Sequence, residues 1–234
     1  MGMLWSFILP LVMLTVYTFI FSVVFKAKWG HQEGSRFEFA LILFCGLIAY
    51  NIFSECVLRA PNLILNNVTY VKKVVFPLEI LPWSTLAASL FFAMANLIVL
   101  LVFNLLVTGE LKWTVILYPF VLLPLLLSTL GISWLLASIG VFVRDISHLI
   151  GVLMSILLFL SPIFYPVESV PPNFQRVLAL NPLSFVIESS REVVLWGRLP
   201  NFEQYLMYFI ASCAVAWLGF FWFQKTKKGF ADVV

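Results

Sequence analysis

Few residues in this chain have the types and the spacing that catalysis or ligand binding requires. The two histidines, His31 and His148, are far apart and have no companions at metal-site spacing. The phosphate-binding pattern Gly-x-x-x-x-Gly-Lys-Ser/Thr is absent, and so are the Gly-x-Ser-x-Gly and His-Glu-x-x-His motifs of hydrolytic enzymes. The sequence therefore predicts no catalytic residue, no metal site and no cofactor bound by this chain.

The acidic and amide side chains near apolar segments suit interfacial contacts better than chemistry. Glu38, Glu55 and Glu79 lie at the edges of apolar runs, where water solvates a carboxylate. Proton-coupled transport would place such groups deep inside a run. Asn51, Asn96 and Asn104 do lie within apolar runs, and interhelical hydrogen bonds explain them at least as well as ligand contacts. If the protein performs work, we expect a partner to supply the energy.

The composition shows what surrounds these residues. The chain has 234 residues, of which 62% are hydrophobic and only 11% are charged, and its mean hydropathy is +1.05. Soluble domains carry about 25% charged residues, whereas one transmembrane helix needs about 20 apolar residues. We therefore expect an all-α membrane protein with one transmembrane domain over residues 1–234. The net charge of +3 is too small to indicate nucleic acid as a partner.

Six apolar runs predict six transmembrane helices. An even number of spans places both termini on the same side of the membrane. The distribution of the 14 basic residues does not decide which side, because half of them lie on each. The cluster of Lys225, Lys227 and Lys228 favours a cytoplasmic C-terminus. The predicted spans are residues 4–25, 39–56, 80–108, 113–143, 147–165 and 204–223.

One segment between the spans, residues 61–75, has the pattern of an amphipathic helix. Ile64, Val68 and Val71 fall on one helical face, and polar residues fall on the opposite face. Pro61 suits the first turn of a helix. This pattern predicts a helix that lies on the membrane surface or docks on a partner, and amphipathicity alone does not choose between the two.

A second non-spanning segment, residues 167–201, predicts a re-entrant helical hairpin. Its two expected helices are residues 172–180 and 183–196. Asn181 suits the N-cap of the second helix and Pro182 its first turn. Charged residues interrupt the apolar pattern too often for this segment to cross a bilayer, so we expect it to re-enter one leaflet or lie on its surface.

Several local sequences, in order along nearly the whole chain, resemble the permease subunit of type-2 ABC transporters. The resemblance is specific to the branch that exports O-antigen (lipopolysaccharide), capsular and teichoic-acid polysaccharides. It is carried by Gly2 to Phe7, the run from Lys73 to Pro82, Val143 to Ile146, Ser161 to Pro166, Asn181-Pro182 and the tail from Lys227 to Asp232.

The resemblance implies a homodimer in the bacterial inner membrane, with both termini cytoplasmic. It also implies a separate cytoplasmic ATPase subunit that binds ATP-Mg. Residues 61–75 would be a cytoplasmic coupling helix, with Ile64, Val68 and Val71 packed against the permease, and residues 167–201 a periplasmic hairpin near the exit. The residues expected to couple to the ATPase are Asn62, Asn66, Lys73, Arg144 and Asp145.

The family resemblance further implies a basic amphipathic interface helix before the first span. This helix has no counterpart after Met1. We therefore expect either a translation start upstream of the assigned one or a truncated paralogue.

Aromatic residues make up 17% of the chain, including 24 Phe. Sugar rings stack on aromatic faces, although Phe and Trp also fill membrane cores and interfacial belts. We expect the partners to include membrane lipids and a lipid-linked glycan. For the function, the alternatives to a polysaccharide exporter are a drug or antibiotic efflux permease of the same superfamily, or a membrane scaffold subunit without transport. The residues expected to face the glycan are Tyr17, Phe21, Phe159, Phe164 and Tyr165.

Overall fold

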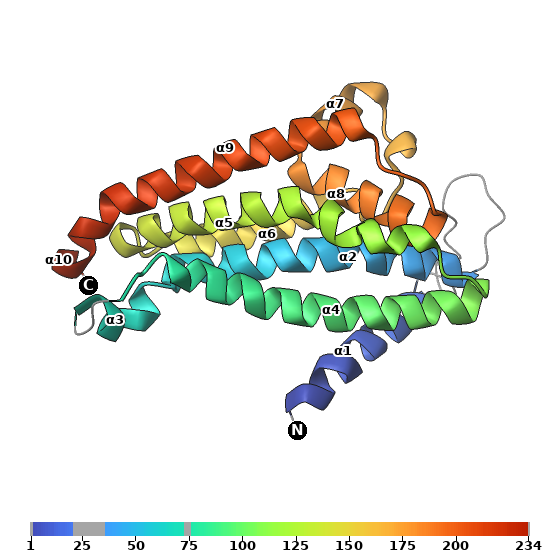
Figure 1. Cartoon of the computed structure of the whole chain (residues 1–234), viewed down its shortest axis with the longest axis horizontal. Coiled ribbons are helices and arrows are strands. Elements are labelled where there is room, and N and C mark those ends of the chain that lie inside the picture. Colours follow the sequence, from blue (N-terminus) through green and yellow to red (C-terminus); the bar gives the residue numbers. More distant parts are fainter. Residues whose placement is uncertain (1, 21–35, 73–75, 234) are drawn as a thin grey trace. The chain divides into compact units, whose positions relative to one another are not determined.

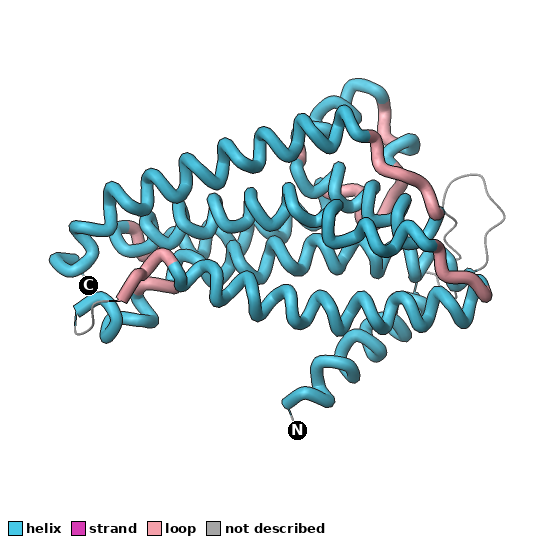
Figure 2. The backbone as a smooth tube through the Cα atoms, viewed as in Figure 1, coloured by secondary structure: helices cyan, strands magenta, loops and turns pink. Residues whose placement is uncertain are grey.

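The computed structural model describes residues 2–20, 36–72 and 76–233 of the chain. Within these ranges every regular element is helical and no strand occurs (Figures 1 and 2). Four helices of the described residues are long and apolar enough to cross a membrane: Phe37–Asn62, Ile80–Thr108, Trp113–Phe142 and Phe202–Gly229. The prediction of an all-α membrane protein is confirmed, while the number of six spans stays a prediction.

The long helices coincide with the apolar runs, which end at charged residues, prolines or glycines. Helix α2 covers Arg36–Arg59 and α9 covers Phe202–Thr226, both slightly longer than the predicted spans. Helix α4 covers Ile80–Thr108 and ends at Gly109, whose positive φ of 74° and N–H bond to the Leu105 carbonyl form a left-handed cap. After a 3-10 turn at Trp113–Leu117, α5 covers Tyr118–Phe142.

Two apolar helices are shorter. Helix α1 covers Gly2–Tyr17, and the predicted end of the first span at residue 25 lies outside the described residues. Helix α6 covers Ile146–Leu160 and therefore ends five residues before the predicted end of this span at residue 165. Pro162 explains the early end, because a proline lacks the N–H of the helical ladder and disfavours helical geometry in the residue before it.

The residues group into two compact units, and five of the helices contribute to both. Unit 1 contains Met1–Tyr50, Phe91–Leu122 and Phe159–Tyr205. Unit 2 contains Asn51–Leu90, Leu123–Leu158 and Leu206–Val234.

Unit 1 contains the helical hairpin. Helix α7 covers Pro172–Leu180, and α8 covers Pro182–Arg191 and continues as a π-helical turn, Glu192–Trp196 (Figure 1). These bounds agree closely with the two short helices that the sequence predicts. Most of α8 is buried, and the π-helical turn is attached to the chain before α5, because the Thr114 hydroxyl donates to the Val193 carbonyl.

In unit 2, helices approach so closely that only glycine fits. A Cβ atom built on Gly131 of α5 would lie 2.4 Å from the Val215 carbonyl oxygen of α9, and one on Gly219 would lie 2.0 Å from the Gly131 oxygen. Either distance is far below van der Waals contact. The backbones of α5 and α9 therefore touch directly at this crossing, in the manner of small-residue interfaces in membranes.

The segment expected to be one coupling helix, residues 61–75, is interrupted in its described part. It consists of 3-10 turns at Ala60–Asn62 and Leu65–Asn67, followed by helix α3, Val68–Lys72. The Asn67 side chain points back along the segment, and its Nδ2 donates to the Leu63 carbonyl, 2.8 Å away. Proline and asparagine both disfavour a regular α-helix, which explains the irregular winding.

The apolar face of this segment is buried only in part. Ile64 is completely buried, Val71 is half-buried and Val68 is 37% exposed. Helix α3 contacts the C-terminal helix α10, Phe230–Val233. Phe230 itself is buried against the rings of Phe142 and Phe223.

Candidate functional site

The turn of the hairpin is connected to the loop that follows α6. Asn181 caps α8, because its Oδ1 accepts a hydrogen bond from the Leu183 N–H at 3.0 Å. Its Nδ2 donates to Oγ of the buried Ser161 at 2.9 Å. One amide side chain therefore starts a helix and holds a loop twenty residues earlier in the chain.

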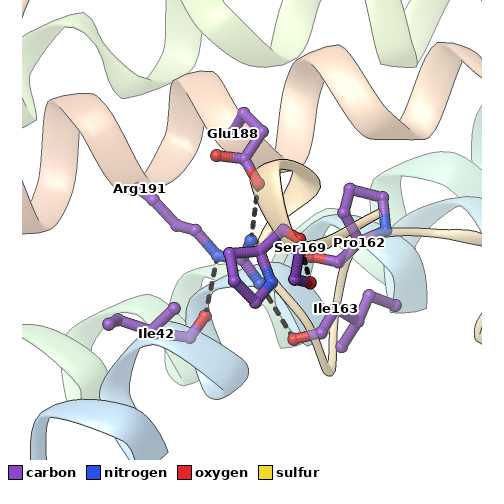
Figure 3. Close-up of polar contacts among 7 residues, drawn as sticks. Ile42, Pro162, Ile163, Ser169, Glu188 and Arg191 are labelled. Atoms are coloured by element: carbon purple, nitrogen blue, oxygen red, sulfur yellow. Dashed lines mark hydrogen bonds and ion pairs between the residues drawn. The ribbon is translucent and has the colours of Figure 1, made fainter. Parts of the chain in front are cut away.

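Arg191, at the end of α8, is a buried cation bonded to backbone carbonyls (Figure 3). Its side chain is 0% exposed. Nε donates to the Ile42 carbonyl of α2 at 3.1 Å, Nη1 to the Pro162 carbonyl at 2.7 Å and Nη2 to the Ile163 carbonyl at 3.0 Å. The Pro162 and Ile163 carbonyls lie in the loop after α6, where no helical ladder supplies them with a donor, so the guanidinium satisfies them.

Glu188 supplies the counter-charge, one helical turn before Arg191. Its Oε1 lies 2.8 Å from Nη1 of Arg191, and its side chain is 31% exposed. Burial raises the pKa of the Glu188 carboxyl, and the nearby guanidinium opposes that rise. Gly46 of α2 leaves room for the guanidinium, because a Cβ atom there would lie 3.0 Å from Nη2. The guanidinium is thus enclosed by backbone atoms, while the Glu188 carboxylate stays partly exposed.

Three of the five residues expected to face a glycan lie together in unit 1. The rings of Phe159 and Phe164 are stacked, with centroids 5.7 Å apart, and the Tyr165 hydroxyl donates to the Phe159 carbonyl at 3.1 Å. Phe159 is 67% exposed. These three residues, named here the aromatic cluster, form a partly open apolar surface of the kind on which sugar rings stack.

The other two expected glycan contacts are both at or near the end of the first described segment. Tyr17 is the last residue of α1 and is half-buried. Phe21 lies outside the described residues.

The residues expected to couple to an ATPase belong to unit 2. Asn66 is exposed and Asn62 is half-buried, both in the segment after α2. Arg144 and Asp145 are exposed in the turn between α5 and α6. Lys73 lies outside the described residues.

Residues 61–75, which are expected to couple to an ATPase and are called here the coupling segment, contact the end of α5 through Pro61. A Cβ atom on Gly140 would lie 2.0 Å from the carbonyl oxygen of Pro61, so the two backbones are in direct contact. Gly140 is four residues before Arg144. This contact therefore brings the Asn62 end of the coupling segment next to the helix that ends at the Arg144–Asp145 turn.

A second polar cluster joins the start of α4 to the residues after α9. Nζ of Lys227 lies 2.7 Å from Oε2 of Glu79, and Nε1 of Trp134 donates to the Glu79 carbonyl at 3.1 Å. Partial burial alone would raise the pKa of the Glu79 carboxyl, but its hydrogen bonds and the charge of Lys227 hold the pKa below its ordinary value.

Sequence reasoning did not identify Arg191 or the Glu79–Lys227 pair. The signal for Arg191 was its position among the apolar residues of the hairpin, where charged side chains are costly and usually functional. For Lys227 and Gly140 the sequence offers no comparable signal, because their partners lie far away in the chain.

Comparison with known proteins is consistent with this architecture. The sequence model of the ABC-2 type transporter matches residues 1–195. The O-antigen export system permease protein RfbA of Myxococcus xanthus is 29% identical over all of this chain and 88% of its own length. A protein of the same name from Klebsiella pneumoniae is 25% identical over the same shares. The polysialic acid transport protein KpsM of Escherichia coli is 26% identical over 85% of this chain and 76% of its own.

Proposed function

Since this chain belongs to the ABC-2 type transporter family, we propose that it exports a lipid-linked polysaccharide across the bacterial inner membrane. The chain is a multi-pass transport protein, and transporters of this family work with an ATPase partner. In the proposed complex, two copies of the chain form the conduit, and ATP-Mg is bound and hydrolysed on the separate cytoplasmic subunit.

The observation that carries this proposal is the full-length match to permeases named for polysaccharide export. The RfbA proteins align over the whole chain, so the match includes the hairpin, the aromatic cluster and the coupling segment. The match to KpsM, named for polysialic acid transport, points to the same class of substrate. O-antigen and polysialic acid are different polymers, so the proposal names a polysaccharide and no particular sugar.

The geometry of unit 2 supports a role for residues 61–75 in coupling to the ATPase. Asn66, Arg144 and Asp145 present polar groups at its surface, and the carbonyl of Pro61 presses on Gly140 of α5. A partner that displaces this segment would therefore displace the end of a long helix. This arrangement requires residues 61–75 and both chain termini to lie in the cytoplasm.

The aromatic cluster supports a polysaccharide as the transported substrate. Phe159 and Phe164 offer stacked rings, and Tyr165 adds a phenol whose hydroxyl is already bonded to the backbone. Flat apolar faces can contact successive sugar rings without holding any one of them strongly. Weak, repeated contacts of this kind suit a long polymer that has to pass through.

The experiment is deletion of the gene in its host, followed by complementation with a tagged copy. We expect the deletion to remove polysaccharide from the cell surface and to leave lipid-linked polysaccharide inside. The tagged protein should co-purify with an ABC ATPase. Unchanged surface polysaccharide together with increased drug sensitivity would instead indicate a drug efflux permease. Restored export by a copy that cannot bind the ATPase would indicate a scaffold.

A further inference from the structure

The loop between α6 and the hairpin, residues 161–166, is tied to the hairpin at its first residue. At its start, Nδ2 of Asn181 donates to Oγ of Ser161, which is 0% exposed. At its end, the loop leads into a 3-10 turn, Val167–Ser169, in which the Ser169 hydroxyl donates to the Pro166 carbonyl at 2.7 Å. The contact at Ser161 ties the loop to the hairpin, whereas the contact at Pro166 is local to the turn.

Arg191 holds the middle of this loop, immediately before two of its aromatic residues. Its guanidinium donates to the carbonyls of Pro162 and Ile163, and the next two residues in the chain are Phe164 and Tyr165. We infer that Arg191 is a positioning residue, which fixes through these two carbonyls how Phe164 and Tyr165 are presented to a passing sugar chain. This inference rests on the proposed function.

The type of side chain supports a positioning role. A guanidinium is a planar fork that can donate to several acceptors at once, whereas a lysine ammonium is a compact point charge on a flexible stem. Here the fork joins α2, the loop and α8, because its acceptors are Ile42, Pro162, Ile163 and Glu188. Burying a charge in a membrane protein costs free energy, and apolar side chains could hold the hairpin in place without that cost. The presence of a charge therefore favours a role beyond packing.

The same contacts give the loop a fixed reference on α2. Nε of Arg191 bonds to the Ile42 carbonyl, and Gly46, one helical turn later, leaves the space that the guanidinium fills. The position of Phe164 therefore depends on α2 through one side chain. Loss of the fork should allow residues 161–166 to move without unfolding either helix.

The test uses the permease–ATPase complex in proteoliposomes, with lipid-linked polysaccharide extracted from the host as the probe. ATP hydrolysis is measured against polysaccharide concentration. For Arg191→Lys we expect the half-saturating concentration to rise about threefold to tenfold, the range for loss of one aromatic contact, with little change in the maximal rate. Hydrogen exchange in residues 161–166 should become faster. Arg198→Lys, the same change at an exposed arginine of the hairpin, should alter neither quantity.

A second variant guards against misfolding. Glu188→Leu with Arg191→Met replaces the buried ion pair by apolar residues of similar size, a change that proteins often tolerate without loss of stability. It should assemble with the ATPase, and it should show the same faster exchange and higher half-saturating concentration as Arg191→Lys.

The outcomes separate this inference from the proposed function. If polysaccharide stimulates the wild-type complex but neither variant changes half-saturation or exchange in residues 161–166, the positioning role is overturned alone. A rise in exchange with unchanged half-saturation also overturns it, since Arg191 would then be merely structural. If polysaccharide does not stimulate the wild-type complex, the proposed function fails, and this inference fails with it.

Discussion

Nζ of Lys227 and Oε2 of Glu79 lie 2.7 Å apart, so an ion pair joins the residues after α9 to the turn before α4. The indole of Trp134 in α5 donates to the carbonyl of the same glutamate. Three segments that are distant in the sequence therefore meet at Glu79. The coupling segment leads into this turn, so the contacts of Glu79 with Lys227 and Trp134 restrain its movement.

Replacing Glu79 by glutamine should lower the stability of the protein by about 0.5–1 kcal/mol, a typical value for a partly exposed ion pair. Because the pKa of Glu79 is lowered in the folded protein, its contribution is present above the ordinary value of 4.5. It is lost as the pH falls through the lower folded pKa. Denaturation of the detergent-solubilised protein at several pH values measures this, and the difference from Glu79→Gln should vanish in acid.

The control for the ion pair is Glu110→Gln. Glu110 also pairs with a lysine, Lys112, but in the exposed turn between α4 and α5. We expect no measurable loss of stability for this variant. An equal loss in both variants would show that the Glu79–Lys227 pair has no special structural role.

An alanine at Gly140 should disturb the coupling segment. The added Cβ would lie 2.0 Å from the Pro61 carbonyl oxygen, so backbone has to move, at a cost of about 1–3 kcal/mol for an overpacked site. We expect export to fall while the protein still inserts into the membrane. Gly151→Ala in α6 is the matched control, because nothing lies within 4 Å of that position. It should be neutral or stabilising by up to about 1 kcal/mol. Equal export by both variants would contradict the contact.

Charge changes on the coupling segment should uncouple ATP hydrolysis from export. Asn66 is exposed, and the sequence predicts that it faces the ATPase together with Lys73. Asn66→Asp with Lys73→Glu should leave the permease folded and the ATPase active but reduce polysaccharide export per ATP hydrolysed. Lys112→Glu, a reversal in an exposed turn of unit 1, should leave the ratio unchanged. Normal export by the double variant would count against the coupling role.

The aromatic cluster should be needed for export and dispensable for assembly. Phe159→Ala and Phe164→Ala each remove one ring of the stacked pair, worth about 0.5–1.5 kcal/mol of contact. Surface polysaccharide should fall in both, with normal amounts of protein in the membrane and normal binding of the ATPase. Phe202→Ala, at a highly exposed ring at the start of α9, should export normally. Export at the wild-type level in all three would remove the cluster from the conduit.

The elements that sequence reasoning located best have strong local signals. The hairpin was placed within one or two residues, because Asn181 and Pro182 are an N-cap and a first-turn proline whatever the rest of the chain does. Helix α4 likewise begins and ends where its apolar run does. Periodicity was less reliable for residues 61–75, where proline and asparagine break the helix that the spacing of apolar residues suggests.

Other parts of the site depend on contacts over long distances in the chain. The burial of Arg191 requires a carbonyl of α2 that is 149 residues away, and the partner of Glu79 is 148 residues away. A single sequence shows that such charges exist but not what surrounds them. The aromatic cluster could be predicted from the sequence because its members are close together in the chain, around the end of α6.

The glycine crossing of α5 and α9 determines how freely these two helices can move against each other. Side chains between two helices can change rotamer and so accommodate small shifts of one helix against the other. At Gly131 and Gly219 no side chains lie between the helices, and backbone contacts backbone directly. We therefore expect a displacement of α5 by Pro61 at Gly140 to move α9 as well, so that the two helices tilt together.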